Sequence, residues 1–278
     1  MAFCRIFVAM LVLIVTFIPV GAGNCGPVFD RVMKRGVVRL GLPYNRVPQG
    51  FIGPDGKWVG FEVDLAGAMA RHMNLKLEKV KVNGKTWPPM LADGRVDGAM
   101  CRIRHSRSLD GEFDFSVAYL YDALRILALK GLFKRPEQLK GHKIAAVQGS
   151  VSEQEAMRML RAAGDEAAEK NVVSYPDRPS CFMALGREKV SGWLDAGLVL
   201  LEYGAKSPGR FELIEVAGAT SPIAVVVSQN DSAWRDLINF TIQDIAADGS
   251  LKKIYDKWFG PNTPHTFSVG RSIEVWSE

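Results

Sequence analysis

The arginines that follow an apolar segment near residue 100 are the residues of this chain best suited to bind an anion. Arg102, Arg104 and Arg107 come soon after Val96–Met100, and Arg46 follows an earlier apolar run. A guanidinium group stays charged, and its N–H donors match the geometry of carboxylates and phosphates. We therefore expect Arg46, Arg102 and Arg104 to contact an anionic ligand. The alternative is a solvated basic turn, because most arginines are exposed, and we favour it for Arg107.

Two more candidate positions lie in the second half of the chain. Asp195 follows the apolar segment Val190–Leu194 and has no basic neighbour in the sequence, which suits an acid that contacts a ligand. Its alternative role is to cap a helix that begins at Ala196. Ser150 follows Gly149 just before a predicted helix, where free backbone N–H groups can bind a carboxylate. We therefore expect Gly149, Ser150 and Asp195 to be ligand-binding residues.

Three further residues are candidates for the same ligand site. Tyr44 and Trp87 can each form part of a cleft wall. The alternative for Tyr44 is an aromatic side chain of a loop with no ligand contact, and the alternative for Trp87 is a hydrophobic contact at the start of a helix. Cys101 ends a predicted strand that faces the cleft. It is better explained as a small buried residue than as a nucleophile, because no histidine is clearly placed to activate it. Ser152 forms a capping-box pattern with Glu155, and ordinary capping explains it fully.

Composition excludes several classes of function. The formal charge is +5 and the pI is near 9.0, and no basic tract is interleaved with aromatic residues, so we expect no nucleic-acid binding. The four histidines are scattered without metal-ligand spacing, so we expect no metal site and no cofactor. Three cysteines follow the leader described below, Cys25, Cys101 and Cys181. An odd number permits at most one internal disulfide.

Residues 1–23 are typical of a secretory signal peptide. Arg5 is the one charge before the apolar run Ile6–Val20, and small residues follow it, as signal cleavage requires. A retained membrane anchor is the alternative. Lipidation of Cys25 is a second alternative, which Asn24 disfavours because it is a poor residue before a modified cysteine. We therefore expect a periplasmic protein.

Strands and helices alternate in the predicted order of elements. The run Gly53–Leu65 is typical of a tight hairpin that leads into a helix with an acidic first turn. The first half has predicted strands at 37–42, 75–82 and 96–100, with helices at 62–73 and 88–92. The second half has strands at 143–147, 172–174 and 190–194, with helices at 152–163, 180–186 and 196–203. A strand at 223–227 and helices at 232–247 and 250–258 close the chain. This order implies parallel sheets flanked by helices, an α/β fold.

Two long apolar segments flank the second set of elements, and they predict a division into lobes. Tyr121–Leu129 and Ile223–Ser228 are expected to be strands that cross between the lobes. Lobe 1 would comprise residues 26–120 and 225–260, lobe 2 would comprise 125–220, and 261–278 would form a tail. Ligands of such sheets bind beyond the carboxyl ends of the strands. Hinge closure would then bury a solute between the lobes.

Six segments of the chain resemble the periplasmic solute-binding proteins of the polar amino-acid ABC transporters (family 3). The segments are Arg35–Gly41, Gly60–Leu65, Trp87–Asp97, Phe113–Tyr119, Leu139–Ser150 and Gly249–Gly260. The resemblance implies a two-lobed type II periplasmic binding fold, with a mostly parallel sheet flanked by helices in each lobe and two hinge strands. It also implies two partners, a small polar solute and a membrane ABC permease. A protein of this family is expected to be a monomer and not an enzyme.

The chain departs from the family pattern at the expected ligand site. Leu109 stands where the family has the arginine that binds the ligand α-carboxylate, and leucine cannot form that bidentate contact. Arg104 stands at a position that is usually threonine, and Arg102 at one that is usually small. Arg46 takes the place of a stacking aromatic, with Tyr44 two positions earlier. These differences imply a rebuilt pocket on the same scaffold.

The resemblance also implies a role for Asp195, which matches the family acid that accepts the ligand ammonium group. With the arginines it predicts an anionic or zwitterionic, amino-acid-like solute. Two other functions remain open. One is an enzyme that resembles periplasmic cyclohexadienyl dehydratases, in which Asp195 would be the general acid. The other is an accessory or signalling protein that uses the fold to dock a partner.

Overall fold

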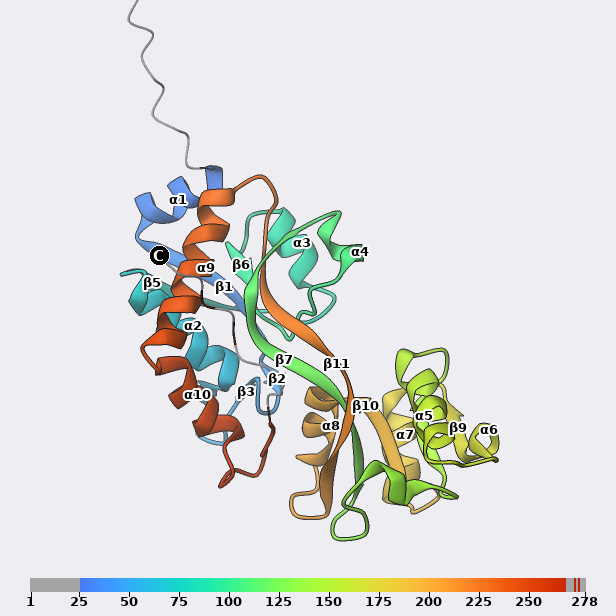
Figure 1. Cartoon of the computed structure of the whole chain (residues 1–278). Helices are drawn as coiled ribbons and strands as arrows, with labels where there is room; N and C mark the ends of the chain where they lie inside the picture. Colours follow the sequence, from blue (N-terminus) through green and yellow to red (C-terminus); the bar gives the residue numbers. More distant parts are fainter. Residues whose placement is uncertain (1–25, 269–272, 274, 276–278) are drawn as a thin grey trace, which may run out of the picture.

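Two lobes joined by a pair of long strands form the protein (Figure 1). The computed structural model describes residues 26–268, 273 and 275. The linking strands β7 (Asp114–Leu129) and β11 (Phe211–Val227) pair in antiparallel fashion and belong to one eight-stranded sheet of order β5-β1-β6-β11-β7-β10-β8-β9. The predicted α/β, two-lobed architecture with two hinge strands is confirmed.

Lobe 1 lies at the upper left of Figure 1 and lobe 2 at the lower right. In lobe 1, β1 (Val37–Leu42) pairs in parallel with both β5 (Lys76–Lys81) and β6 (Gly98–Ala99). A separate three-stranded sheet contains β2 (Asn45–Arg46), β3 (Gly50–Ile52) and β4 (Trp58–Val59). The helices of the lobe are α1 (Pro27–Arg35), α2 (Phe61–His72), α3 (Trp87–Ala92), α4 (Arg107–Asp110), α9 (Ser232–Ala247) and α10 (Ser250–Phe259).

Lobe 2 repeats the parallel arrangement. Its strand β8 (Ile144–Val147) pairs in parallel with β9 (Val172–Tyr175) and β10 (Gly192–Ala196). The carboxyl ends of these three strands therefore lie at one edge of the sheet. The helices are η1 (Pro136–Leu139, a 3-10 turn), α5 (Val151–Ala162), α6 (Ala168–Asn171), α7 (Arg178–Gly186) and α8 (Gly197–Gly204).

The bounds of several elements differ from those predicted. The hinge strands β7 and β11 are longer than the apolar segments that indicated them, because their polar residues still pair through the backbone. Strand β10 begins and ends two residues later than expected, so Asp195 lies within the strand. The division into lobes at residues 120, 125, 220 and 225 stays a prediction.

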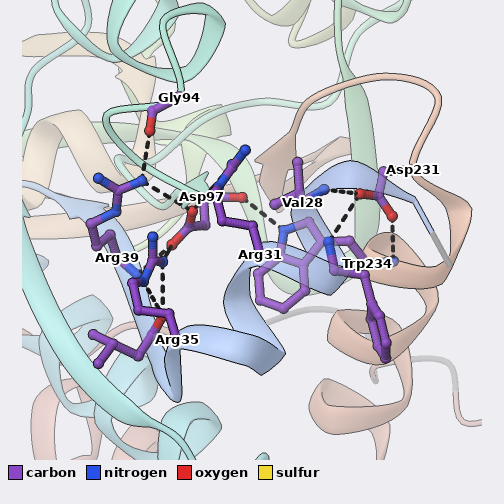
Figure 2. A network of polar contacts seen from close by, with 10 residues as sticks. Val28, Arg31, Arg35, Arg39, Gly94, Asp97, Asp231 and Trp234 are labelled. Atoms are coloured by element: carbon purple, nitrogen blue, oxygen red, sulfur yellow. Dashed lines mark hydrogen bonds and ion pairs between the residues drawn. The ribbon is translucent and has the colours of Figure 1, made fainter.

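Helix α1, which was not predicted, is tied to lobe 1 by Asp231. The carboxylate of Asp231 accepts the backbone N–H groups of Val28 at 2.6 Å and of Trp234 at 3.0 Å, so it caps both α1 and α9 (Figure 2). A side chain on Gly26 would come within 2.2 Å of Asp231 Oδ1. Glycine is therefore required at this close approach.

A buried acid, Asp97, joins three arginines of lobe 1 (Figure 2). Its side chain is fully buried and forms ion pairs with Arg31 at 3.4 Å, with Arg39 at 3.5 Å and with Arg35. The backbone N–H of Arg39 also donates to Asp97 at 2.7 Å. The network fixes the turn before β6 against α1 and β1, and so positions the arginines that follow β6.

The hairpin before α2 forms as the sequence predicts. The N–H of Gly53 donates to the carbonyl of Lys57 at 2.8 Å, which closes the turn between β3 and β4. The chain then enters α2 through Gly60, whose φ is 141°. A side chain at Gly60 would meet the carbonyl oxygen of Gln49 at 2.4 Å. This close approach lets the N–H of Glu62 bond to the carbonyl of Gln49 at 2.8 Å.

The chain after α10 crosses from lobe 1 towards the hinge strands. Phe267 is buried and its N–H donates to the carbonyl of Phe259 at 3.1 Å. The guanidinium of Arg125, on β7, lies 5.4 Å from the Phe267 ring and donates to the carbonyl of Ser268 at 3.2 Å. The tail therefore ties the end of α10 to a hinge strand.

Candidate functional site

A cavity of about 860 Å³ lies where the hinge strands meet the carboxyl ends of the lobe 2 strands. Residues of both lobes form its wall. Arg104 comes from lobe 1, Asp122 and Ser221 from the hinge strands, and Ser150, Arg178 and Asp195 from lobe 2. Three of the nine predicted site residues, Arg104, Ser150 and Asp195, therefore line one cavity.

Asp195 forms an ion pair with Arg178 in this cavity. The guanidinium Nε donates to Oδ2 at 3.0 Å and Nη2 donates to Oδ1 at 3.3 Å. Asp195 Oδ1 also accepts the N–H of Ala196 at 2.7 Å. Asp195 has no basic neighbour in the sequence, but the fold gives it one, so the expectation of an unpaired acid was wrong. The parallel pairing of β9, β8 and β10 could have indicated Arg178, because it brings the residues after β9 near the end of β10.

Arg104 is exposed and reaches the cavity from the lobe 1 side. Its backbone pairs with that of Ile223 on β11 in an isolated bridge. Among the described residues, no ion pair of 4 Å or less is formed by its guanidinium. The charge of Arg104 also reaches the buried Asp122, which accepts the N–H of Leu198 at 3.1 Å. Burial raises the pKa of Asp122, against the opposing effects of that hydrogen bond and of the Arg102 and Arg104 charges.

Arg102 lies in a different, buried cluster. Its φ is 52°, and its backbone N–H donates to Glu62 Oε1 at 2.8 Å. The same oxygen accepts the hydroxyl of Tyr119 at 2.5 Å. Burial raises the pKa of Glu62, although the hydrogen bonds from Tyr119 and Arg102 and the charges of Arg102 and Arg46 oppose this. Arg102 and Arg46 are not among the residues that line the cavity.

Ser150 is the cap of α5, the role that the sequence suggested for Ser152. Its hydroxyl accepts the N–H of Glu153 at 3.2 Å and donates to the carbonyl of Val147 at 2.6 Å. The N–H of Gly149 donates a hydrogen bond to the Glu153 carboxylate at 2.7 Å. Ser152 is buried. Ser150 therefore has a structural role as well as a place in the cavity wall.

The chain matches the model of the bacterial extracellular solute-binding proteins, family 3, over residues 38–261. It belongs to that family. The L-glutamate/L-aspartate-binding protein of Pseudomonas aeruginosa is 28% identical over 88% of this chain and 84% of its own length. The L-cystine-binding protein of Escherichia coli K12 is 25% identical over 83% of this chain and 85% of its own length.

Solved structures agree with this family assignment. An ancestral arginine-binding protein bound to arginine is 28% identical, with a TM-score of 0.59 over 81% of this chain and 99% of its own. The L-cystine solute receptor of Neisseria gonorrhoeae, in an unliganded open conformation, has a TM-score of 0.68 at 22% identity. The match covers 84% of this chain and 97% of the receptor. The latter likeness supports the fold alone.

The remaining predicted residues of this solute-binding protein lie outside the cavity wall. Trp87 is 5% exposed and packs on Phe113, with ring centroids 4.9 Å apart. The ring centroid of the half-buried Tyr44 lies 5.7 Å from Lys81 Nζ. Cys101 is buried, and burial raises the pKa of its thiol to about 12. A packing role explains Trp87 and Cys101, and the proposed ligand contacts of all three stay predictions.

Several expectations concern other features of this family member. Cys101 and Cys181 are both free, buried thiols. Within residues 26–268, 273 and 275, no three His, Cys, Asp or Glu side chains are grouped to hold a metal ion. In the same part of the chain, no helix has the length and apolar character needed to cross a membrane. The signal peptide at 1–23 and the thiol of Cys25 lie outside the described residues.

Proposed function

We propose that this chain is a periplasmic receptor that captures a small, carboxylate-bearing, amino-acid-like solute and presents it to a membrane ABC permease. One observation carries the proposal. Arg104 of lobe 1 and the Arg178–Asp195 pair of lobe 2 line the same cavity beside the hinge strands. A solute that contacts both sides favours the closed arrangement of the lobes, because it binds that state more tightly.

The family and the named ligands of the relatives support this proposal. Relatives are named for binding glutamate and aspartate, cystine, and arginine, all of which carry a carboxylate. The predicted leader at 1–23 agrees with export. The proposed lobes are residues 26–120 with 225–260, and 125–220, in a protein that acts as a monomer.

The proposal is for a binding protein and not for an enzyme. Asp195 is the residue suggested as general acid for a dehydratase, and both of its oxygens accept hydrogen bonds from Arg178. A general acid must instead present its proton to the leaving group. Release of an aromatic product from prephenate or arogenate by the purified protein would contradict this part of the proposal.

Ligand binding can be tested by calorimetry and by thermal unfolding with L-glutamate, L-aspartate, L-cystine and L-arginine. A solute stabilises its receptor against unfolding by RT ln(1 + [L]/Kd), so the melting temperature rises with the logarithm of the solute concentration once that exceeds Kd. Arg104→Ala should weaken carboxylate binding by about tenfold or more, because a charge-assisted contact is lost. Arg107→Ala is the matched control, since Arg107 is exposed on α4 and does not line the cavity. Failure of every solute to bind would contradict the proposal and favour a docking role.

A further inference from the structure

We propose that Arg178 is the anion-binding group of lobe 2 and that Asp195 is a positioning residue that holds it. The site then recognises a solute by its carboxylate and does not require an α-ammonium group. This inference rests on the proposed function and names the solute class of that site. It also reassigns Asp195, which resemblance alone would make the acceptor of an ammonium group.

The geometry of the pair fixes the guanidinium in place. Two N–H donors on one edge of Arg178 engage the two oxygens of Asp195, at 3.0 and 3.3 Å. The carboxylate is itself anchored by the N–H of Ala196 at 2.7 Å and lies within β10. Such a two-point contact restrains the rotation of a guanidinium. A fixed donor loses less entropy when a ligand binds.

Burial decides which member of the pair a solute can reach. The side chain of Asp195 is 6% exposed, whereas that of Arg178 is 48% exposed. Both residues line the cavity. Of the two members of this pair, the guanidinium is therefore the one that a solute can reach.

The count of hydrogen-bonding groups points the same way. A guanidinium has five N–H donors, and Arg178 uses two of them on Asp195, with no other acceptor among the described residues. Asp195 has about four acceptor positions, of which three are taken by Arg178 and Ala196. Arg178 thus keeps three N–H donors for an anion. Asp195 keeps one acceptor position, whereas an ammonium group has three N–H bonds to satisfy.

The other acids of the cavity wall are also engaged. Glu155 is paired with Arg158, Asp177 accepts the N–H of Ser180 at 2.8 Å as the cap of α7, and Asp122 accepts the N–H of Leu198 at 3.1 Å. Arg104 enters from lobe 1, and no acid in the described part of the chain forms an ion pair with it. Asp195 compensates the charge of Arg178, so Arg104 is the cation of this pair of arginines that a solute anion would compensate. A carboxylate solute can do this while it also accepts the remaining N–H donors of Arg178.

Matched pairs of probes test the inference, because each amino acid has an analogue that lacks only the amino group. The pairs are L-glutamate with glutarate and L-aspartate with succinate. Calorimetry on the full chain would compare the wild type, Asp195→Asn, Arg178→Ala, Arg178→Lys and the double variant Arg178→Ala with Asp195→Asn. Arg187→Ala is the control, since Arg187 is exposed at the other end of α7 and lines no part of the cavity.

We expect each analogue to bind the wild type within about tenfold of its amino acid. Arg178→Ala should weaken both members of a pair by about tenfold or more. Asp195→Asn should weaken both members by a similar factor, and should add less than about twofold in the Arg178→Ala background. Arg178→Lys should restore only part of the affinity, since lysine cannot form the two-point contact with Asp195.

Other results would overturn the inference. If Asp195→Asn weakens the amino acid by more than tenfold and leaves its analogue unchanged, Asp195 binds ammonium directly. If Arg178→Ala leaves both probes bound as in the wild type, Arg178 is not the anion group. Each result leaves the receptor function intact. If no probe of either pair, and none of the solutes named above, binds the wild type, the receptor function itself fails and the inference fails with it. Circular dichroism of each variant would show that loss of binding is not loss of folding.

Discussion

Arg102 and Glu202 link the two lobes beside the hinge. Arg102 follows β6 in lobe 1, Glu202 lies on α8 in lobe 2, and Nη1 is 3.5 Å from Oε2. Their side chains are only 10% and 24% exposed, so solvent and salt screen this pair less than a surface pair. Because β7 and β11 are the covalent links between the lobes, this ion pair adds a separate contact that must break or shift when the lobes move.

Glu202→Gln should loosen the arrangement of the lobes. We expect a broader distribution of distances between spin labels at the exposed Lys85 and Lys189, one in each lobe. The free energy of unfolding should fall by about 1 kcal/mol, because Arg102 keeps other acids nearby. Glu188→Gln, which removes a pair confined to lobe 2, should leave the distribution unchanged. An unaltered distribution in Glu202→Gln would show that the pair does not restrain the lobes.

The buried Glu62 should make stability depend on pH. Burial raises its pKa above the 4.5 of a free glutamate, so the folded chain holds this proton more tightly than the unfolded chain. The stabilising contribution is therefore full below about pH 4.5 and is lost as the pH rises through the folded-state pKa. Burial raises the pKa of Asp122 too, so its stabilising contribution is likewise full below about pH 3.8 and is lost as the pH rises through its folded-state pKa.

Urea unfolding between about pH 4 and pH 8 would measure this effect. Glu62→Gln should flatten the decline of the free energy of unfolding with rising pH, because an amide does not titrate. Glu137→Gln is the control, since Glu137 is exposed on η1. Equal slopes for the wild type and Glu62→Gln would contradict the assignment.

Asp97→Asn should be among the most destabilising polar substitutions in lobe 1. The amide nitrogen that replaces one oxygen cannot accept hydrogen bonds from Arg35 and Arg39, and the negative charge between the arginines is lost. We expect a loss of about 3 kcal/mol in the free energy of unfolding. Asp93→Asn should cost far less, because Asp93 is 61% exposed. Solute affinity should change little in either variant, since neither residue lines the cavity.

Phe267→Ala should release the tail from the hinge. The ring packs on Phe259 and lies so close to Gly197 that a Cβ there would approach it to 2.6 Å. Removal of this buried ring should cost about 3 kcal/mol. Hydrogen exchange of residues 261–268 should become faster. Phe240→Ala is the comparison, since Phe240 is 53% exposed on α9. Unchanged exchange rates in the Phe267 variant would contradict a tethering role for the ring.

The two buried thiols should resist modification in the folded protein. Burial raises the pKa of both Cys101 and Cys181 to about 12, and the thiolate is the reactive form. In a chain that carries Cys4→Ser and Cys25→Ser, a thiol reagent at pH 8 should react with neither residue until urea unfolds the protein. Rapid reaction of either thiol under native conditions would show that it is accessible.

Local sequence patterns were enough to predict most of the scaffold. The bounds of β1 at Val37–Leu42 and of α9 at Ser232–Ala247 agree with the sequence, because apolar spacing and caps are properties of neighbouring residues. The hairpin before α2 depends on Gly53 and its neighbours for the same reason. Helix α1 was not predicted, although Pro27 at its start and Gly36 at its end are local signals. Its cap, Asp231, lies more than 200 residues later in the chain and could not be read from the local sequence.

The candidate site was only partly predictable. The sequence alone determined that arginines follow the apolar segment Val96–Met100 and that an acid follows Val190–Leu194. It also showed that six segments typical of the family occur in the family's order. Tertiary structure decided which of these charged residues meet. It directs Arg102 to Glu62 and Glu202, leaves Arg104 at the cavity, and brings Arg178 to Asp195 across 17 positions of sequence. The physical reason is that a charged side chain pairs with whatever the sheet order places beside it. That order is set by hydrogen bonds between strands far apart in the chain, which no local pattern records.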